Sequence, residues 1–112
     1  MVTNYTPSRG DIVWIDFGST KGHEQSGRRP AIVVSQETYN RKSERALFCP
    51  LTTKVKGHIF EVLVAGGKIT GVILVDQIRT LDWSTRGIIF IEPALQAVVD
   101  EVEAKLLTLI RH

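Results

Sequence analysis

Short apolar segments separated by glycine, proline and polar residues constrain the fold of this 112-residue chain more than any other feature. They are rich in β-branched and aromatic residues, which pack well on a pleated sheet. Apolar runs of this length fit strands buried on both faces, or a small closed barrel. We therefore expect strands at residues 11–17, 31–35, 46–51, 59–64, 71–75 and 87–91.

The C-terminal segment has a different period. Pro93 suits the first turn of a helix, and apolar side chains then recur every three or four residues. This apolar face consists of Leu95, Val98, Val99, Val102, Leu106, Leu109 and Ile110. A shorter helical turn is expected over residues 37–43. The sequence thus predicts one mostly-β (α+β) domain over residues 1–112, in which a small barrel-like sheet packs against a C-terminal amphipathic helix.

Length and cysteine content indicate a cytoplasmic protein. A chain of this size can bury one core without disulfides, and Cys49 stands alone inside an apolar run, so we expect a buried, unreactive thiol. No apolar stretch approaches the roughly 18 residues that span a bilayer. The N-terminal residues also lack the apolar middle region of a signal peptide.

The charges are unevenly distributed along the chain. Residues 1–60 hold nine Lys/Arg and five Asp/Glu, whereas residues 61–112 hold five and seven, so the net charges are +4 and −2. A polyanion would be attracted to the first half. The same asymmetry is also compatible with an ordinary solvated surface.

A polar connection of twelve residues, 18–29, joins the first two expected strands. Most hairpin loops have about two to five residues, and longer ones in compact domains are often functional. Lys21, His23, Glu24, Arg28 and Arg29 give this connection its chemistry. A plain surface loop is the alternative.

The sequence gives no support to metal or cofactor chemistry. His23, His58 and His112 are scattered and Cys49 is alone, so no ligand spacing for a metal is present. The phosphate-binding patterns GxxxxGK[ST] and GxGxxG are absent, and so is the GxSxG pattern of a serine nucleophile. What remains is a basic, loop-bearing β domain.

Several stretches of the chain resemble the MazF/PemK toxins. The likeness begins with GDIVWIDF at residues 10–17 and KGHEQSGRRPAIVVS at residues 21–35, in which the E-Q-x-G-x-R-P segment is specific. It continues in the same order at residues 50–53, 57–62 and 71–79, and so covers nearly the whole chain. The resemblance implies an SH3-like β barrel of the PemK/CcdB type, a homodimer, metal-independent cleavage of single-stranded RNA, and inhibition by an acidic cognate antitoxin.

The resemblance also implies site residues. Arg29, directly before Pro30, and Thr52, two residues after Pro50, match the family's catalytic pair, and Glu24 matches a glutamate that supports activity. Arg28 lies at a position that varies in the family. Each residue also has a structural reading: the arginines as solvated charges, and Thr52 as a strand hydroxyl that bonds to the backbone.

The chemistry of metal-free RNA cleavage fits these residue types. The ribose 2′-hydroxyl attacks the adjacent phosphorus, which leaves a 2′,3′-cyclic phosphate and a 5′-hydroxyl. A guanidinium can donate to two phosphoryl oxygens at once, and a hydroxyl can add a further donor. Arginine stays protonated in proteins and is a poor base. Glu24 or His23, with ordinary pKa values of about 4.3 and 6.5, is the easier base.

Further residues are candidates for holding the RNA. Single strands expose base faces and edges to stacking and hydrogen bonding. We expect Phe17 to stack on a base, although core packing is an equal alternative, and Gln77 to read a base edge. The basic candidates are Lys21, His23, Arg28, Lys54, Lys56 and His58.

Two other functional classes stay open on the sequence. A gyrase-inhibiting toxin of the CcdB type would use the same barrel without catalysis, and would not need the Arg29/Thr52 pair. An RNA-binding SH3-like module would bind RNA without cutting it. Only a nuclease gives RNA fragments, so a cleavage assay separates the three.

Overall fold

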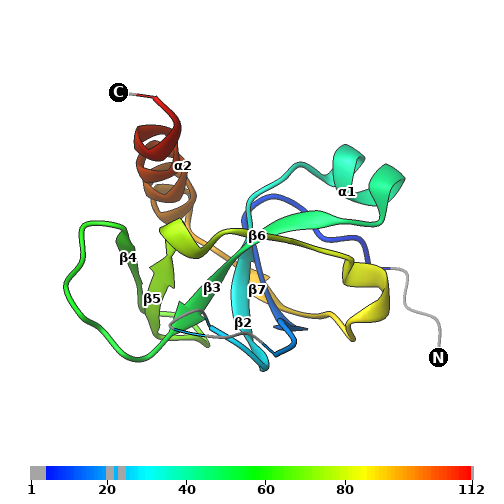
Figure 1. Ribbon diagram of the computed structural model, residues 1–112, viewed down its shortest axis with the longest axis horizontal. Coiled ribbons are helices and arrows are strands. Elements are labelled where there is room, and N and C mark those ends of the chain that lie inside the picture. Colours follow the sequence, from blue (N-terminus) through cyan, green and yellow to red (C-terminus); the bar gives the residue numbers. More distant parts are fainter. Residues whose placement is uncertain (1–4, 20–21, 23–24, 112) are drawn as a thin grey trace.

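The computed structural model describes residues 5–19, 22 and 25–111. Within them the chain forms a mostly-β fold with two α-helices, shown in Figure 1. The strands are β1 (Asp11–Asp16), β2 (Arg28–Val33), β3 (Ala46–Thr52), β4 (Glu61–Val64), β5 (Gly71–Leu74), β6 (Arg79–Leu81) and β7 (Ile89–Pro93). The helices are α1 (Glu37–Ser43) and α2 (Gln96–Ile110), and the 3-10 turns are η1 (Val75–Gln77) and η2 (Trp83–Thr85).

The strands form a curled sheet in which β3 changes partners along its length. Their order is β4-β5-β3-β2-β1-β7, and β6 pairs with β3 outside this path. The first part of β3 pairs with β2 and β6, whereas its last two residues, Leu51 and Thr52, pair with β5. All of these neighbours are antiparallel. The predicted mostly-β sheet with a C-terminal helix is confirmed.

Both faces of the central part of this sheet are buried, which explains why its strands lack a regular polar–apolar alternation. Successive residues of a strand point to opposite faces. Ile12 and Ile32 belong to a core that includes Val99 and Val102 of α2, while Val13 and its neighbours belong to a second core on the other face. The apolar runs of the sequence therefore reflect two cores that share one sheet.

Several predicted strand boundaries need correction. Strand β2 begins at Arg28 and runs through Pro30, and β3 runs through Pro50 to Thr52. Strand β4 begins only at Glu61, because residues 53–60 form a loop. In Figure 1 this loop bulges away from the sheet between β3 and β4. Strand β6 was not predicted, because it is three residues long and two of them, Arg79 and Thr80, are polar.

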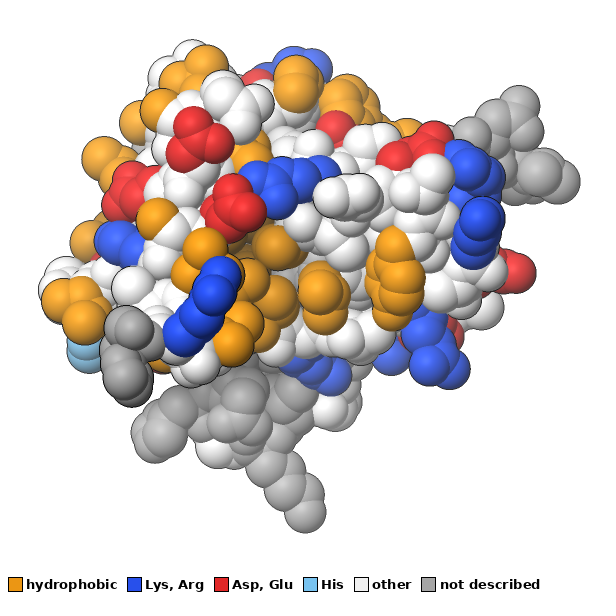
Figure 2. All heavy atoms as spheres, turned by 90° about the horizontal axis from the view of Figure 1, so that it is seen from above, with side chains coloured by type: hydrophobic (Ala, Val, Ile, Leu, Met, Phe, Trp, Pro, Cys, Tyr) orange, Lys and Arg blue, Asp and Glu red, His pale blue; other side chains and the backbone are white. Residues whose placement is uncertain are grey.

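The C-terminal helix begins later than predicted, and its buried face is narrower. Pro93 ends β7, and α2 begins at Gln96. Val99 and Val102 are buried, but Leu95, Leu109 and Ile110 are exposed. Figure 2 shows one face of the molecule, on which hydrophobic side chains form patches that acidic and basic side chains interrupt. Within the described residues no helix is long and apolar enough to cross a membrane.

Candidate active site

Strand pairing brings Arg29 and Thr52 to the same place. Strands β2 and β3 are antiparallel, with Ala31 opposite Pro50. Ala31 and Pro50 are the last pair of this ladder, and Arg29 of β2 and Thr52 of β3 lie two residues beyond it on the same side. Both line one pocket of about 430 Å³, which we call the arginine pocket. Its lining residues are Trp14, Arg28, Arg29, Pro30, Leu51, Thr52, Thr53, Lys68, Ile69 and Thr70.

The Arg29 guanidinium is held in place from the loop side. Its Nε donates to the carbonyl oxygen of Ser26 at 3.0 Å, and the side chain is half-buried. Backbone hydrogen bonds from Phe17 N to Gly27 O and from Gly27 N to Gly18 O close the stem of this loop. Burial lowers the pKa of the Arg29 guanidinium below its ordinary value. The two terminal nitrogens, which Ser26 does not engage, are the fork that could meet a phosphate.

Thr52 lies at the boundary between two pockets. Besides the arginine pocket it lines a second pocket of about 380 Å³, which we call the loop pocket. The lining residues of the loop pocket are Gln25, Thr52, Lys54, Lys56, His58, Phe60, Glu61, Leu74, Asp76 and Gln77. Thr52 Oγ1 accepts the backbone N–H of Lys54 at 3.2 Å, as in the structural reading of this residue. A Cβ at Gly71 would come within 2.4 Å of the Thr52 carbonyl oxygen, so a glycine there lets β5 lie against Thr52.

The loop pocket brings together Lys54, Lys56, His58 and Gln77, all of them predicted to bind RNA. The two lysines and the histidine are exposed in the β3–β4 loop, and Gln77 lies in η1, which follows β5. Gln77 Oε1 accepts the backbone N–H of Gln25 at 2.9 Å. The polar end of Gln77 is thereby held against the β1–β2 connection.

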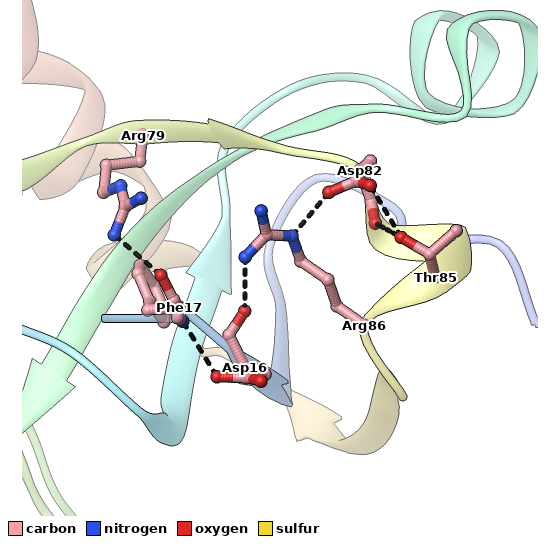
Figure 3. Close-up of polar contacts among 7 residues, drawn as sticks. Asp16, Phe17, Arg79, Asp82, Thr85 and Arg86 are labelled. Atoms are coloured by element: carbon pink, nitrogen blue, oxygen red, sulfur yellow. Dashed lines mark hydrogen bonds and ion pairs between the residues drawn. The ribbon is translucent and has the colours of Figure 1, made fainter. Parts of the chain in front are cut away.

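Phe17 does not present a stacking surface. Its side chain is 1% exposed and packs in the second core, so the core alternative holds and the base-stacking prediction is wrong. Arg79 lies 5.6 Å from the centre of its ring and donates to its carbonyl oxygen at 3.0 Å. Figure 3 shows Arg79 and Arg86 converging on the end of β1, where Arg86 donates to the Asp16 carbonyl oxygen.

Some predictions fall outside the described residues, and some site residues were not predicted. Lys21, His23 and Glu24 lie outside the described residues. Arg28 is exposed at the rim of the arginine pocket. Lys68 lines the arginine pocket and Glu61 lines the loop pocket, and neither was among the predicted site residues. In the part of the chain that the structure describes, no three His, Cys, Asp or Glu side chains lie close enough together to hold a metal ion.

Known proteins share this sequence pattern. Residues 8–110 match the family of PemK-like, MazF-like toxins of type II toxin–antitoxin systems. The endoribonuclease toxin MazF of Escherichia coli (strain K12) is 47% identical over 87 residues, which are 78% of each chain. The endoribonuclease PemK of Escherichia coli is 31% identical over 107 residues, which cover 91% of this chain and 80% of that one.

Solved structures of the family share the fold. The crystal structure of MazF (Form-I) from Deinococcus radiodurans has a TM-score of 0.91 at 41% identity, and the match covers 96% of this chain and 98% of that one. The crystal structure of MazE-MazF (Form-II) from the same organism has a TM-score of 0.84 at 37% identity, covering 96% and 97%. The chain therefore belongs to the PemK-like, MazF-like toxins of type II toxin–antitoxin systems.

Proposed function

We propose that this protein is an endoribonuclease toxin that cuts single-stranded messenger RNA without a metal ion and so inhibits translation and growth. The observation that supports this most directly is the meeting of Arg29 and Thr52 in one pocket at the end of the β2–β3 ladder. Relatives named endoribonucleases share this sequence over most of its length. A gyrase poison or a non-catalytic module would not need this pair.

The proposed reaction uses the RNA's own 2′-hydroxyl as nucleophile. Its oxygen forms the new bond to phosphorus, and the bond from phosphorus to the 5′-oxygen breaks. The 5′-oxygen takes up one proton and the 2′-hydroxyl loses one, so the reaction releases a 5′-hydroxyl with no net change in protons. The other product is a 2′,3′-cyclic phosphate. Negative charge gathers on the non-bridging oxygens during the reaction. The Arg29 fork and the Thr52 hydroxyl would stabilise that charge, and Glu24 or His23 would accept the 2′-hydroxyl proton.

The loop pocket would hold the RNA beside the cut. Lys54, Lys56 and His58 offer positive charge for phosphates, and the Gln77 amide nitrogen offers donors for a base edge. Lys21 and Arg28 would add charge on the side of the arginine pocket. Thr52 lines both pockets, so a strand that crosses it would place one phosphate at the arginine.

We further propose that the toxin works in the cytoplasm as a homodimer and is inhibited by an acidic antitoxin. Solved structures of MazE-MazF from Deinococcus radiodurans pair a relative with its partner protein. The +4 charge of residues 1–60 favours an acidic segment, because opposite charges attract across an interface. Binding of such a segment should weaken as salt increases.

A cleavage assay tests the proposed activity. Intact messenger RNA is incubated with the protein in EDTA, in parallel with RNA that carries 2′-deoxyribose at the mapped scissile nucleotide. We expect fragments with 2′,3′-cyclic phosphate ends from the first substrate and no cut at that nucleotide in the second. Loss of cleavage in EDTA, or cutting at the 2′-deoxy nucleotide, would exclude this mechanism. Intact RNA in every lane would leave the two non-catalytic classes.

A further inference from the structure

We propose that Glu61 is a positioning residue that holds the β3–β4 loop in the shape that binds RNA, so that it controls affinity and not the rate of cleavage. This inference rests on the proposed function, because it assigns a role within the same RNA site. Glu61 is the first residue of β4, and its side chain points back at the loop that precedes it. It lies in one of the stretches that resemble the family, residues 57–62, but the sequence alone assigns it no role.

The Glu61 carboxylate accepts hydrogen bonds from two consecutive backbone N–H groups of this loop. Oε2 lies 3.1 Å from the nitrogen of Lys56, and Oε1 lies 2.9 Å from the nitrogen of Gly57. The Glu61 N–H in turn donates to the His58 carbonyl oxygen at 3.1 Å. One residue therefore contacts the loop at three successive positions, and two of these, 56 and 58, are proposed to bind RNA.

Glu61 itself is firmly fixed. It is only 9% exposed, and β4 pairs with β5 through Glu61 and Leu74. Lys105 of α2 donates to its carbonyl oxygen at 2.7 Å. The loop, in contrast, has no helix or strand of its own between Thr53 and Phe60. A rigid carboxylate thus anchors a segment that regular structure does not hold.

Anchoring of this kind lowers the cost of binding. A loop that becomes ordered only when RNA arrives loses conformational freedom at that moment, which weakens affinity. Hydrogen bonds from N–H groups to a charged carboxylate are stronger than neutral ones. Both oxygens of Glu61 already accept loop N–H groups. Glu61 therefore fits the role of a support for Lys56 and its neighbours better than that of a direct base contact.

A second glutamate provides a matched control. Glu92 of β7 accepts the backbone N–H groups of Lys68 and Ile69, at 2.9 and 3.2 Å, and so holds the β4–β5 turn. It makes the same kind of contact as Glu61, but to a segment that lines the arginine pocket. Loss of either carboxylate leaves two backbone N–H groups without their acceptor. The two variants should therefore differ only in which pocket they disturb.

The test measures RNA affinity and cleavage rate separately. Affinity is measured with uncleavable RNA that carries 2′-deoxyribose at the scissile nucleotide, at several salt concentrations. Rate is measured as single-turnover cleavage at saturating protein. Glu61→Gln should weaken binding about tenfold, because the loop side chains must then be ordered on binding. Its saturated rate should stay within about twofold of wild type. The slope of log Kd against log salt should also fall, by about 0.7 for each phosphate of a single strand that the loop no longer neutralises.

Coupling to Lys56 distinguishes positioning from general destabilisation. If Glu61 acts through the loop, Glu61→Gln combined with Lys56→Ala should weaken binding by less than the product of the two single effects. Glu92→Gln combined with Lys56→Ala should weaken binding by the full product of those two single effects, because Glu92 holds a different segment of the chain. Unfolding midpoints of all variants identify any that do not fold.

Gly57→Ala provides an independent lesion of the same loop. Gly57 has φ of +80°, and an added Cβ would meet no atom within 4 Å, so the substitution strains the backbone without a clash. It should reproduce the Glu61→Gln pattern, and it replaces that variant if Glu61→Gln does not fold. The proposal is overturned if the loop variants bind RNA as wild type does, if their saturated rate falls as much as their affinity, or if they do not couple to Lys56. If wild-type protein does not cleave RNA at all, the proposed function fails instead.

Discussion

The arginine pocket and the loop pocket meet at Thr52, but they are built in different ways. In the arginine pocket, Arg29 and Thr52 belong to strands whose backbones pair in a ladder. In the loop pocket, Lys54, Lys56 and His58 come from a segment without regular structure, held chiefly by the Glu61 carboxylate. Arg29 and Thr52 are thus carried by the sheet, whereas the cations of the loop pocket depend chiefly on one carboxylate for their position.

This difference suits two different tasks. Groups that stabilise a transition state must be held within about 0.5 Å of the productive position. Strands provide such precision, because every backbone hydrogen bond of the ladder opposes a shift. Charges that hold the phosphates of a flexible strand tolerate more movement, since their attraction falls slowly with distance. We therefore expect substitutions in the arginine pocket to change rate, and those in the loop pocket to change affinity.

The largest effect is expected for Arg29→Ala. The substitution removes the fork that meets the developing charge, and loss of one such donor costs on the order of 100- to 1000-fold in rate. RNA affinity should fall far less, because the loop lysines still hold the phosphates. Single-turnover cleavage at saturating protein, beside binding of the 2′-deoxy analogue, measures both quantities.

Arg29→Lys is the control for this substitution. A lysine keeps the positive charge but cannot donate two parallel hydrogen bonds as the planar fork does, so it should restore little of the rate. If Arg29→Ala cleaves at nearly the wild-type rate once RNA is saturated, Arg29 only anchors phosphates. The distinction between the two pockets would then disappear.

Thr52→Val should have a smaller effect, shared between the two pockets. Valine keeps the shape of threonine but removes the hydroxyl, which we propose donates to the phosphate and which accepts the Lys54 N–H. We expect a rate loss of about tenfold, below that of Arg29→Ala because a neutral donor is weaker than a charged one. A loss of affinity should accompany it, because the loop loses one tether at its start. A change of rate without a change of affinity would mean that the Thr52 hydroxyl acts only in the arginine pocket.

Lys56→Ala should show the opposite pattern. With one phosphate no longer neutralised, binding should weaken severalfold at moderate salt, and the salt slope should fall by about 0.7. The saturated cleavage rate should stay nearly unchanged, since the reacting phosphate still meets Arg29. Binding titrations at several salt concentrations measure this. An equal fall in rate and affinity would contradict the assignment of the loop pocket to binding.

The sequence predicted the parts of the site that belong to apolar runs or to a family motif. Arg29 and Thr52 could be proposed because each adjoins or follows a proline at a strand, in a pattern that resembles the family. The cations of the loop pocket could be proposed because they crowd a short polar connection. Phe17 could not be assigned, because a ring at the end of a strand fits either a core or a surface until the packing is known.

Contacts that depend on how loops and side chains fold in three dimensions could not be predicted. Glu61 looks like an ordinary polar residue at the start of a strand, and its role depends on how the preceding loop folds back over it. Strand β6 is too short and polar for a pattern to indicate. The same holds for Arg86, which reaches across about seventy residues of sequence to the end of β1.

The smallest expected effect is on stability, and it concerns the contact between Arg86 and the end of β1. Arg86 donates to the Asp16 carbonyl oxygen at 2.9 Å, and Asp82 holds Arg86 through an ion pair, as Figure 3 shows. Hydrogen bonds from Arg86, and then from Thr85, lower the pKa of Asp82 to about 2 from its ordinary 3.8. The folded state thus binds this proton less readily than the unfolded state. The ionised carboxylate contributes its full stabilisation above about pH 4, and this is lost as the pH falls toward 2.

Asp82→Asn should therefore lower the unfolding temperature slightly at pH 7, and this difference from wild type should shrink between pH 4 and pH 2. The effect is small because the Asp82 side chain is half-exposed, and exposed ion pairs contribute little. Thermal unfolding at pH 7, 4 and 2 measures it, with Glu103→Gln, which breaks the distant exposed pair with Arg9, as a comparison. A difference that stays constant over this range would mean that the Asp82 charge does not support the sheet. If the difference in unfolding temperature disappears in acid while the Asp82→Asn variant cleaves RNA at the wild-type rate at pH 7, the Asp82–Arg86 pair supports stability but does not position Arg29 and Thr52.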